Sequence, residues 1–154
     1  MEFTKRTKLN KLEKQQLLEL WNTEYPSVIA HSTTESFELY LEKLESPCHH
    51  FVIDNNNVLG WFCEFNRNGE PNFAMIMAKI SQKKGIGTQL ISEAKMRNSQ
   101  LNGWVVLNSG YLKSDGSPYL SPVGFYKKNG FEILNDQVWE TETLKTVKIR
   151  WQKS

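Results

Sequence analysis

Two closely spaced glycines and two lysines mark the segment with the clearest chemical potential, which reads Ser81-Gln82-Lys83-Lys84-Gly85-Ile86-Gly87-Thr88. An apolar run at residues 73–80 precedes the glycines and a helical pattern at residues 86–97 follows, which predicts a strand, a turn and a helix N-terminus. The first amides of a helix lack intrahelical partners and together carry about half a positive charge, so they attract phosphate. Glycine leaves room for a bulky anion at the backbone. The turn is therefore interpreted as a diphosphate site; the alternative, that the glycines serve only the turn, stays open.

Two helices are expected ahead of this unit. Asn10 is a suitable N-cap, with a glutamate three residues further on, and predicts a helix over residues 11–24. A second helix is expected after Ser32, because apolar side chains then follow at i, i+3, i+4 and i+7. Ser46-Pro47 is expected to end it, since proline disfavours helical geometry in the residue before it.

Several short segments have the composition of strands. Asn68-Gly69 predicts a hairpin, and Ser121, followed by Pro122, predicts the start of a short helix. A strand–helix–strand passage over residues 73–108 implies one parallel pair, and the other pairs are expected to be antiparallel. We therefore predict a single domain over residues 1–154, an α/β fold with a mixed, mostly antiparallel sheet flanked by helices. The expected strands are residues 50–54, 58–66, 73–79, 104–108, 131–134 and 144–151.

The composition narrows the classes of function. A net charge of +2 over 154 residues, with basic residues in runs no longer than two, favours neither a nucleic-acid nor a membrane partner. Cys48 and Cys63 match no metal-site spacing, so no metal is expected, and reduced thiols indicate the cytoplasm. No apolar stretch approaches the roughly 20 residues that span a bilayer.

Two motifs now agree with one family. Gln82-Lys83-Lys84-Gly85-Ile86-Gly87 resembles the acyl-CoA turn of the GNAT acetyltransferase superfamily, Arg/Gln-x-x-Gly-x-Gly/Ala. Downstream, Phe125-Tyr126-Lys127-Lys128-Asn129-Gly130-Phe131 resembles the Phe-Tyr-x-x-x-Gly-Phe signature of that superfamily. One helix and one strand are expected between the motifs, as in the family. The resemblance covers roughly residues 58–134 and implies a GNAT acyl-CoA N-acyltransferase-like fold.

The resemblance also implies a co-substrate, acetyl-CoA, and its contacts. The amides of the turn would hold the CoA diphosphate, and these belong to Gln82, Lys83, Lys84, Gly85, Ile86, Gly87 and Thr88. In the family, the strand before the turn splays from its parallel neighbour and leaves backbone groups free for the pantetheine and the thioester. Here those groups would belong to Ile76, Met77 and Ala78. Amides aimed at the thioester oxygen would stabilise the oxyanion of a tetrahedral intermediate.

The sequence departs from the family pattern before the second motif. The family often has Asn-x-x-Ala there, whereas this chain has Tyr119 and Pro122 at those positions. A contact between an asparagine and pantetheine is therefore not expected. The loop at residues 109–120 is longer than a minimal connection and is a candidate cover for the acceptor site.

Two residues are candidates for proton transfer. Tyr126 would protonate the departing CoA thiolate, because a phenol with a pKa near about 10 is protonated at neutral pH. The alternative is that Tyr126 only packs. Glu64, on the strand face opposite Trp61 and Cys63, is the candidate general base, with a solvated strand carboxylate as the alternative. The end of the first helix, with Glu24, is a candidate wall of the acceptor site.

The leading hypothesis is an acetyl-CoA-dependent N-acetyltransferase that acts by direct attack of a primary amine in a ternary complex. The acceptor is a small-molecule or peptide amine that the sequence does not identify, and a homodimer stays open. The alternative is a non-catalytic acyl-CoA-binding sensor or scaffold of the same fold. A dinucleotide-binding oxidoreductase is disfavoured because Leu90 occupies the place of a third glycine.

Overall fold

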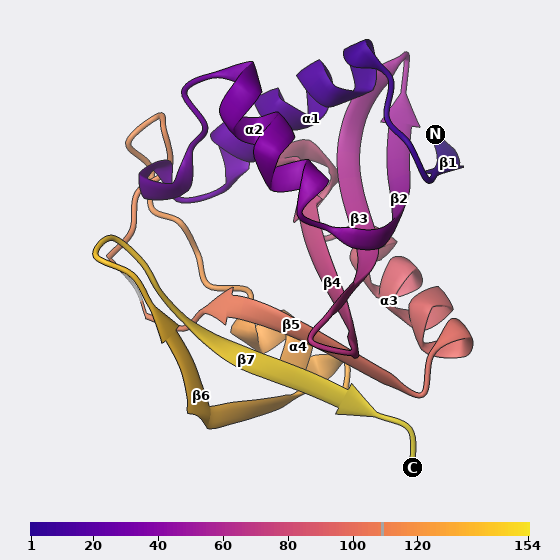
Figure 1. Cartoon of the computed structure of the whole chain (residues 1–154), viewed down its shortest axis with the longest axis vertical. Coiled ribbons are helices and arrows are strands. Elements are labelled where there is room, and N and C mark those ends of the chain that lie inside the picture. Colours follow the sequence, from indigo (N-terminus) through magenta and orange to yellow (C-terminus); the bar gives the residue numbers. More distant parts are fainter. Residues whose placement is uncertain (109) are drawn as a thin grey trace.

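Seven strands form one sheet in the order β1-β2-β3-β4-β5-β7-β6 (Figure 1). The computed structural model describes residues 1–108 and 110–154; Ser109, the expected first residue of the long loop, lies outside this description. In chain order the elements are β1 (Glu2–Arg6), α1 (Lys11–Glu24), the 3-10 helix η1 (Ser27–Ile29), α2 (Thr34–Glu42), β2 (Glu45–Asp54), β3 (Asn57–Arg67), β4 (Glu70–Met77), the 3-10 helix η2 (Lys79–Ser81), α3 (Ile86–Arg97), β5 (Gln100–Val106), α4 (Val123–Lys128), β6 (Glu132–Glu140) and β7 (Lys145–Gln152). The predicted mixed, mostly antiparallel sheet is confirmed.

Alternation along β3 divides the core into two clusters. Trp61, Cys63 and Phe65 belong to a cluster with side chains of α1 and α2, whereas Phe62 belongs to a cluster with side chains of α3 and α4. Figure 1 shows α1 and α2 together over one part of the sheet and α3 near the opposite side. Residues at spacing two share a strand face, so this strand carries both layers.

Local sequence signals set the first two helices. The capping box of α1 is confirmed: Asn10 Oδ1 accepts from the amide of Glu13 at 2.8 Å, and Glu13 Oε1 accepts from the amide of Asn10 at 3.0 Å. The cap of α2 is Thr33, one residue beyond the expected Ser32, and its Oγ1 accepts from the amide of Ser36 at 3.1 Å.

The two parallel strands on either side of α3, β4 and β5, pair over only a short stretch. β4 and β5 share one registered pair, Asn72 with Asn102, and then diverge (Figure 1). Asn102 Nδ2 donates to the carbonyl of Pro71 at 3.0 Å, which fastens the strands where they meet. Beyond this pair, the edge of β4 that faces β5 has no registered strand partner, while the other edge of β4 pairs with β3.

The strand predictions need several corrections. β4 and β5 begin three and four residues before their expected starts, and each ends two residues before its expected end. β1 was not expected, because its five residues are mostly exposed and polar and give little alternating signal; it pairs antiparallel with β2. Pro47 lies inside β2 rather than at a helix end, and the register shift between Glu45 and Cys48 accommodates it, since proline is tolerated at bulges. β6 continues past Leu134 through a register irregularity.

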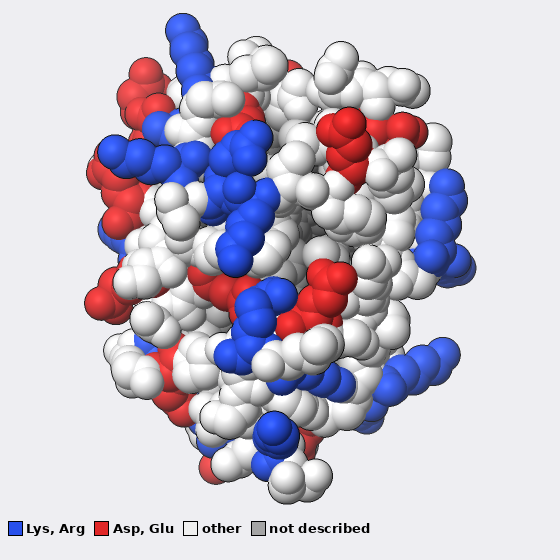
Figure 2. All heavy atoms as spheres, turned by 90° about the vertical axis from the view of Figure 1, so that its right-hand side faces the viewer, with Lys and Arg blue, Asp and Glu red and all other residues white. Residues whose placement is uncertain are grey.

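Charged side chains are mixed on the face that Figure 2 shows, where Lys and Arg are interspersed with Asp and Glu. A surface of mixed sign produces weaker long-range fields than a surface of one sign. No helix in residues 1–108 or 110–154 is long and apolar enough to cross a membrane.

Candidate active site

A groove of about 530 Å³ lies at the N-terminus of α3, between the end of β4 and α4. Its lining includes much of the predicted cofactor site, namely Ile76, Met77, Gln82, Lys83, Gly85, Gly87 and Thr88, together with Tyr126 of α4. The structure therefore brings the two sequence motifs to one cavity, although 37 residues of chain lie between Thr88 and Tyr126.

The two glycines of the turn have different structural roles. Gly85 is the N-cap of α3 with φ at +78°, and a Cβ built on it would meet nothing within 4 Å. Gly87 has no such open space, because its Cβ would lie 3.0 Å from Cζ of Phe125. Gly85 thus provides the left-handed turn and an open approach to the first amides of α3, and Gly87 allows α3 and α4 to pack closely.

The backbone of β4 presents alternate residues to the gap. Ala78 donates its amide to the carbonyl of Leu59 at 2.8 Å, so the expectation of an unpaired amide at Ala78 is wrong. Ile76 lies two residues away, opposite Trp61, and therefore also directs its backbone groups to β3. Met75 and Met77 alternate with these residues along β4, so their backbone groups point away from β3 and toward β5. Their carbonyls accept from side chains: Met77 from Gln82 Nε2 at 2.9 Å, and Met75 from the Tyr25 hydroxyl at 3.4 Å.

Tyr126 lies in the wall of the groove with a buried ring. The ring packs against Phe73 and Phe131, with centroids 5.6 and 5.4 Å away. Burial, with a smaller contribution from Tyr119, raises the pKa of the Tyr126 phenol well above its usual value. The hydroxyl is therefore protonated across the physiological pH range and can act as a proton donor.

A second, smaller cavity of about 210 Å³ adjoins the groove. Both cavities are lined by Tyr25, Met75, Tyr119, Pro122 and Tyr126. The small cavity also has walls from both layers, for example Trp21 of α1, because the separation of β4 from β5 leaves the sheet open there. The two cavities thus meet inside the gap, at the side chains of Met75 and Tyr126.

An ion pair and a backbone hydrogen bond hold the loop before α4 in place beside the point where the two cavities meet. Lys113 Nζ forms an ion pair with Glu24 Oε1 at 2.9 Å, and the amide of Ser27 donates to the carbonyl of Leu112 at 2.8 Å. The other carboxylate oxygen of Glu24 accepts from the amide of Lys79 at 3.2 Å. Glu24 is buried in the groove wall and holds both the loop and the segment after β4.

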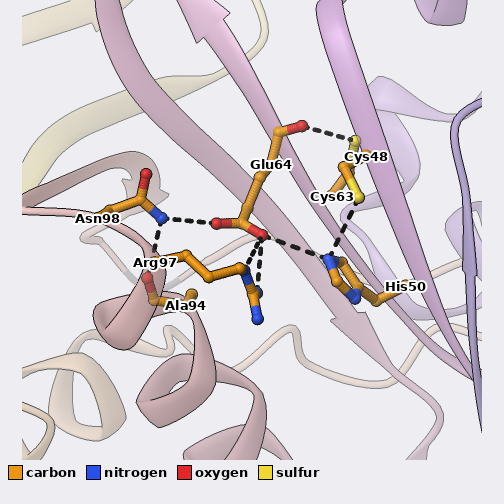
Figure 3. Close-up of polar contacts among 7 residues, drawn as sticks. All are labelled: Cys48, His50, Cys63, Glu64, Ala94, Arg97 and Asn98. Atoms are coloured by element: carbon orange, nitrogen blue, oxygen red, sulfur yellow. Dashed lines mark hydrogen bonds and ion pairs between the residues drawn. The ribbon is translucent and has the colours of Figure 1, made fainter.

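Glu64 lies elsewhere, at the other end of α3 (Figure 3). It is on the expected face of β3, but its carboxylate accepts from Arg97 at 2.7 Å and from Asn98 at 2.7 Å, and it lines neither cavity. A helix of this length spans about 18 Å, which separates Arg97 from the turn. Burial raises the pKa of Glu64, but hydrogen bonds from His50 and Arg97 outweigh it and lower the pKa to about 2. The structure gives Glu64 a role in joining β3 to α3 and does not bring it to the groove.

The thiol and imidazole groups near Glu64 form no catalytic triad. Cys48 Sγ and a Glu64 oxygen both approach Nε2 of His50, at 3.6 and 3.3 Å (Figure 3). A nucleophile–histidine–carboxylate triad needs the two partners on different ring nitrogens. Cys63 is buried, and burial raises the pKa of its thiol, so it is a core residue. The described part of the chain contains no group of His, Cys, Asp and Glu side chains that could hold a metal ion.

Some predicted site residues lie beside the groove rather than in its lining. Ile86 is buried in the core, and Lys84 is exposed outside the lining residues. Met75 and the place of Tyr119 at the junction were not predicted from the sequence. Every second residue of β4 directs its backbone groups away from β3, and Met75 is one of these residues. Which residues these are depends on the register with β3, and the sequence does not give that register.

Comparisons with known proteins agree with this geometry. A family model described as acetyltransferase (GNAT) domain matches residues 46–133, so the chain belongs to the GNAT acetyltransferase family. No curated protein matches the chain in sequence.

Solved structures share the fold at low sequence identity. An aminoglycoside 6'-N-acetyltransferase complexed with coenzyme A has a TM-score of 0.69 and 16% identity, with 99% of this chain and 97% of that chain covered. The aminoglycoside 6'-N-acetyltransferase from Enterococcus faecium has a TM-score of 0.65 and 14% identity, over 99% and 97%. A ribosomal-protein-alanine N-acetyltransferase from Brucella melitensis has a TM-score of 0.61 and 14% identity, over 97% and 99%.

Proposed function

We propose that this protein is an acetyl-CoA-dependent N-acetyltransferase that acts on a primary amine by direct attack in a ternary complex. The observation that carries the proposal is the meeting of two cavities at Tyr126, one of which begins at the glycine turn of α3. A thioester carrier would occupy the groove and an amine would occupy the smaller cavity. A protein of the same fold was solved as a complex with coenzyme A, which supports a CoA thioester as the co-substrate.

The turn fits a diphosphate in its chemistry. Gly85 has open space at its Cβ position, and the amides at the start of α3 are directed away from the helix. Lys83 lines the same groove and would add positive charge. The amide of Gln82 donates to the carbonyl of Lys79 at 3.2 Å, so the expectation that this amide holds the diphosphate is wrong. We assign the diphosphate to the amides of residues 83–88, with Lys84 and Ile86 contributing only backbone groups.

The acyl transfer would proceed in two steps. The nitrogen of the amine attacks the thioester carbonyl carbon, and the resulting oxyanion is stabilised by a backbone amide of β4, at Met77 or Met75. The C–S bond then breaks, the leaving sulfur takes the proton of the Tyr126 hydroxyl, and solvent water returns a proton to the Tyr126 phenolate. Since the described walls of the smaller cavity include no carboxylate, we assign the proton of the attacking amine to solvent water.

Calorimetry with acetyl-CoA tests the cofactor assignment. The Gly85→Glu variant places a carboxylate beside the diphosphate and strains a residue with φ of +78°, so we expect it to abolish binding. Gly69→Glu is the matched control, because Gly69 has φ of +75°, open space at its Cβ and a position in the β3–β4 hairpin. Absence of binding by the unmodified protein at millimolar acetyl-CoA would overturn the proposal.

The alternative, an acyl-CoA-binding sensor or scaffold, predicts binding without turnover. A screen of mixed amine acceptors with release of free CoA as the readout separates the two functions. The two free cysteines, Cys48 and Cys63, support a reducing compartment, and we place the reaction in the cytoplasm.

A further inference from the structure

We propose that the amine acceptor has an apolar, preferably aromatic, body with an anionic group at the end opposite its amine, and that Arg67 binds this anion. The inference rests on the proposed acetyl transfer and adds the class of acceptor. It is carried by the walls of the smaller cavity and by the ion pairs around Arg67.

The walls of the smaller cavity are mostly aromatic and aliphatic. Arg67 is the one charged residue among the described residues that line this cavity. The aromatic side chains in the lining are Trp21, Tyr25, Tyr40, Phe65, Phe73, Trp104, Tyr119, Tyr126 and Trp139. Such walls favour a flat apolar body through burial of its surface and ring contacts.

Arg67 has no carboxylate partner among the described residues. Its guanidinium lies 5.1 Å from the ring centroid of Phe65, which also lines the cavity. Glu70 is opposite Arg67 in the hairpin register, but its two carboxylate oxygens bind Lys148 Nζ and Arg150 Nη2, both at 2.6 Å. The half-buried guanidinium of Arg67 is therefore available to pair with a carboxylate of a ligand.

The position of Arg67 sets the distance between the two ends of the acceptor. The amine must reach Met75 and Tyr126, where the cavities meet. Met75 lies opposite Phe62 on β3, and Arg67 is five residues further along, which corresponds to about 16 Å of strand. The Arg67 side chain covers only part of that distance, so an anion and an amine on the same carbon atom would not reach both ends.

The same wall disfavours a polycationic acceptor. Additional ammonium groups would be placed beside the Arg67 guanidinium, in a cavity whose described lining offers no carboxylate to pair with them. An unpaired charge moved out of water costs free energy, and like charges add repulsion. The acceptor class of the aminoglycoside acetyltransferases that share the fold is therefore not expected for this chain.

Three amines of similar size test the inference: 4-(aminomethyl)benzoate, benzylamine and 1,4-bis(aminomethyl)benzene. Binding of each is measured by calorimetry with and without CoA, so that the readout does not need turnover. We expect 4-(aminomethyl)benzoate to bind about ten-fold more tightly than benzylamine, which corresponds to about 1.4 kcal/mol, because only the benzoate can form a charge-assisted hydrogen bond with Arg67. The diamine should bind most weakly.

Variants of Arg67 separate its charge from its packing. Arg67→Met should reduce the preference for the benzoate over benzylamine to about one, and Arg67→Lys should retain part of it. Lys5→Met, which removes an exposed charge on β1, should leave the ratio as it is. An equal affinity for the three amines, no binding of the benzoate, or a ratio unchanged by Arg67→Met would overturn the inference. Tighter binding of kanamycin than of the benzoate would also overturn it, whereas failure of the proposed function would appear as absence of acetyl transfer to every amine.

Discussion

Lys113 and Glu24 form a 2.9 Å ion pair that joins the loop before α4 to the last turn of α1. Both side chains are largely buried, and the loop has a further backbone bond to this region at Ser27. The pair therefore fixes the loop, with Tyr119, over the point where the two cavities meet.

Lys113→Met should loosen this loop. The change leaves the Glu24 carboxylate with the amide of Lys79 as its one remaining partner among the described groups. We expect unfolding free energy to fall by about 1–3 kcal/mol, because a buried charged acceptor loses its counter-charge. Urea unfolding measures the loss, and limited proteolysis measures exposure of the loop. The double variant with Glu24→Gln should recover part of the loss; additive losses would contradict the coupling.

Tyr126→Phe should lower kcat and leave acetyl-CoA affinity nearly unchanged. The substitution retains the ring that packs on Phe73 and removes only the hydroxyl that would protonate the thiolate. General acid catalysis typically contributes about 10²–10⁴-fold, which is the expected loss of turnover. Steady-state kinetics and calorimetry on the same preparation separate the two quantities. Turnover equal to that of the unmodified protein would reject Tyr126 as the proton donor.

His49 should make stability decline between pH 6.5 and pH 4. Its ring is buried, accepts from Trp61 Nε1 at 3.0 Å, and has a pKa lowered to about 4 by burial. In that window the unfolded chain binds a proton that the folded chain does not, so stability is present above pH 6.5 and falls as pH decreases, by up to about 3 kcal/mol. Urea unfolding at a series of pH values measures the slope. His49→Gln should flatten it, and an unchanged slope would contradict the assignment.

Glu64 should act in a lower window, between pH 4.5 and pH 2. Its pKa in the folded protein is about 2, so the folded state keeps the carboxylate ionised where the unfolded state is protonated. The stabilisation is complete above pH 4.5 and is lost as pH falls towards 2, with a magnitude of up to about 3 kcal/mol. Glu64→Gln should remove this dependence and lower stability at neutral pH. Glu132→Gln, an exposed carboxyl on β6, serves as the control and should change neither.

Elements with a local signal were predictable from sequence. The bounds of α1 and α3 agree with the expected 11–24 and 86–97, because a capping box and a glycine turn define their first residues. β1 was missed because its stability comes from pairing with β2, a partner more than 40 residues away. Propensity alone carries little information about such an edge strand.

The residues of the candidate site also fall into those with a local sequence signal and those whose place depends on distant parts of the chain. The turn at Gly85 is a contiguous motif, so its place at a groove could be expected from the residues alone. Glu64 was assigned to the right face of β3, but alternation does not specify which end of a strand lies near the opening. The backbone of Ala78 was wrongly expected to be free, and Met75 was not singled out, because which residues of β4 bond to β3 depends on the register with β3. Arg67 could not be predicted as an anion site, because the ion pairs of Glu70 with two cations of the distant strand β7 form only in the folded chain.

The separation of β4 from β5 has a mechanical consequence. One hydrophobic cluster draws side chains from both sides of the separation, such as Phe73 and Leu101, whereas the other is confined to residues before it. The strands β5, β6 and β7 are therefore attached to β4 mainly through a single apolar layer, one backbone pair and the ion pairs of Glu70 with Lys148 and Arg150. A molecule bound between β4 and β5 would contact the strands on both sides of the separation and couple their unfolding. Slower amide hydrogen exchange in β5 and β7 would then report that the site is occupied.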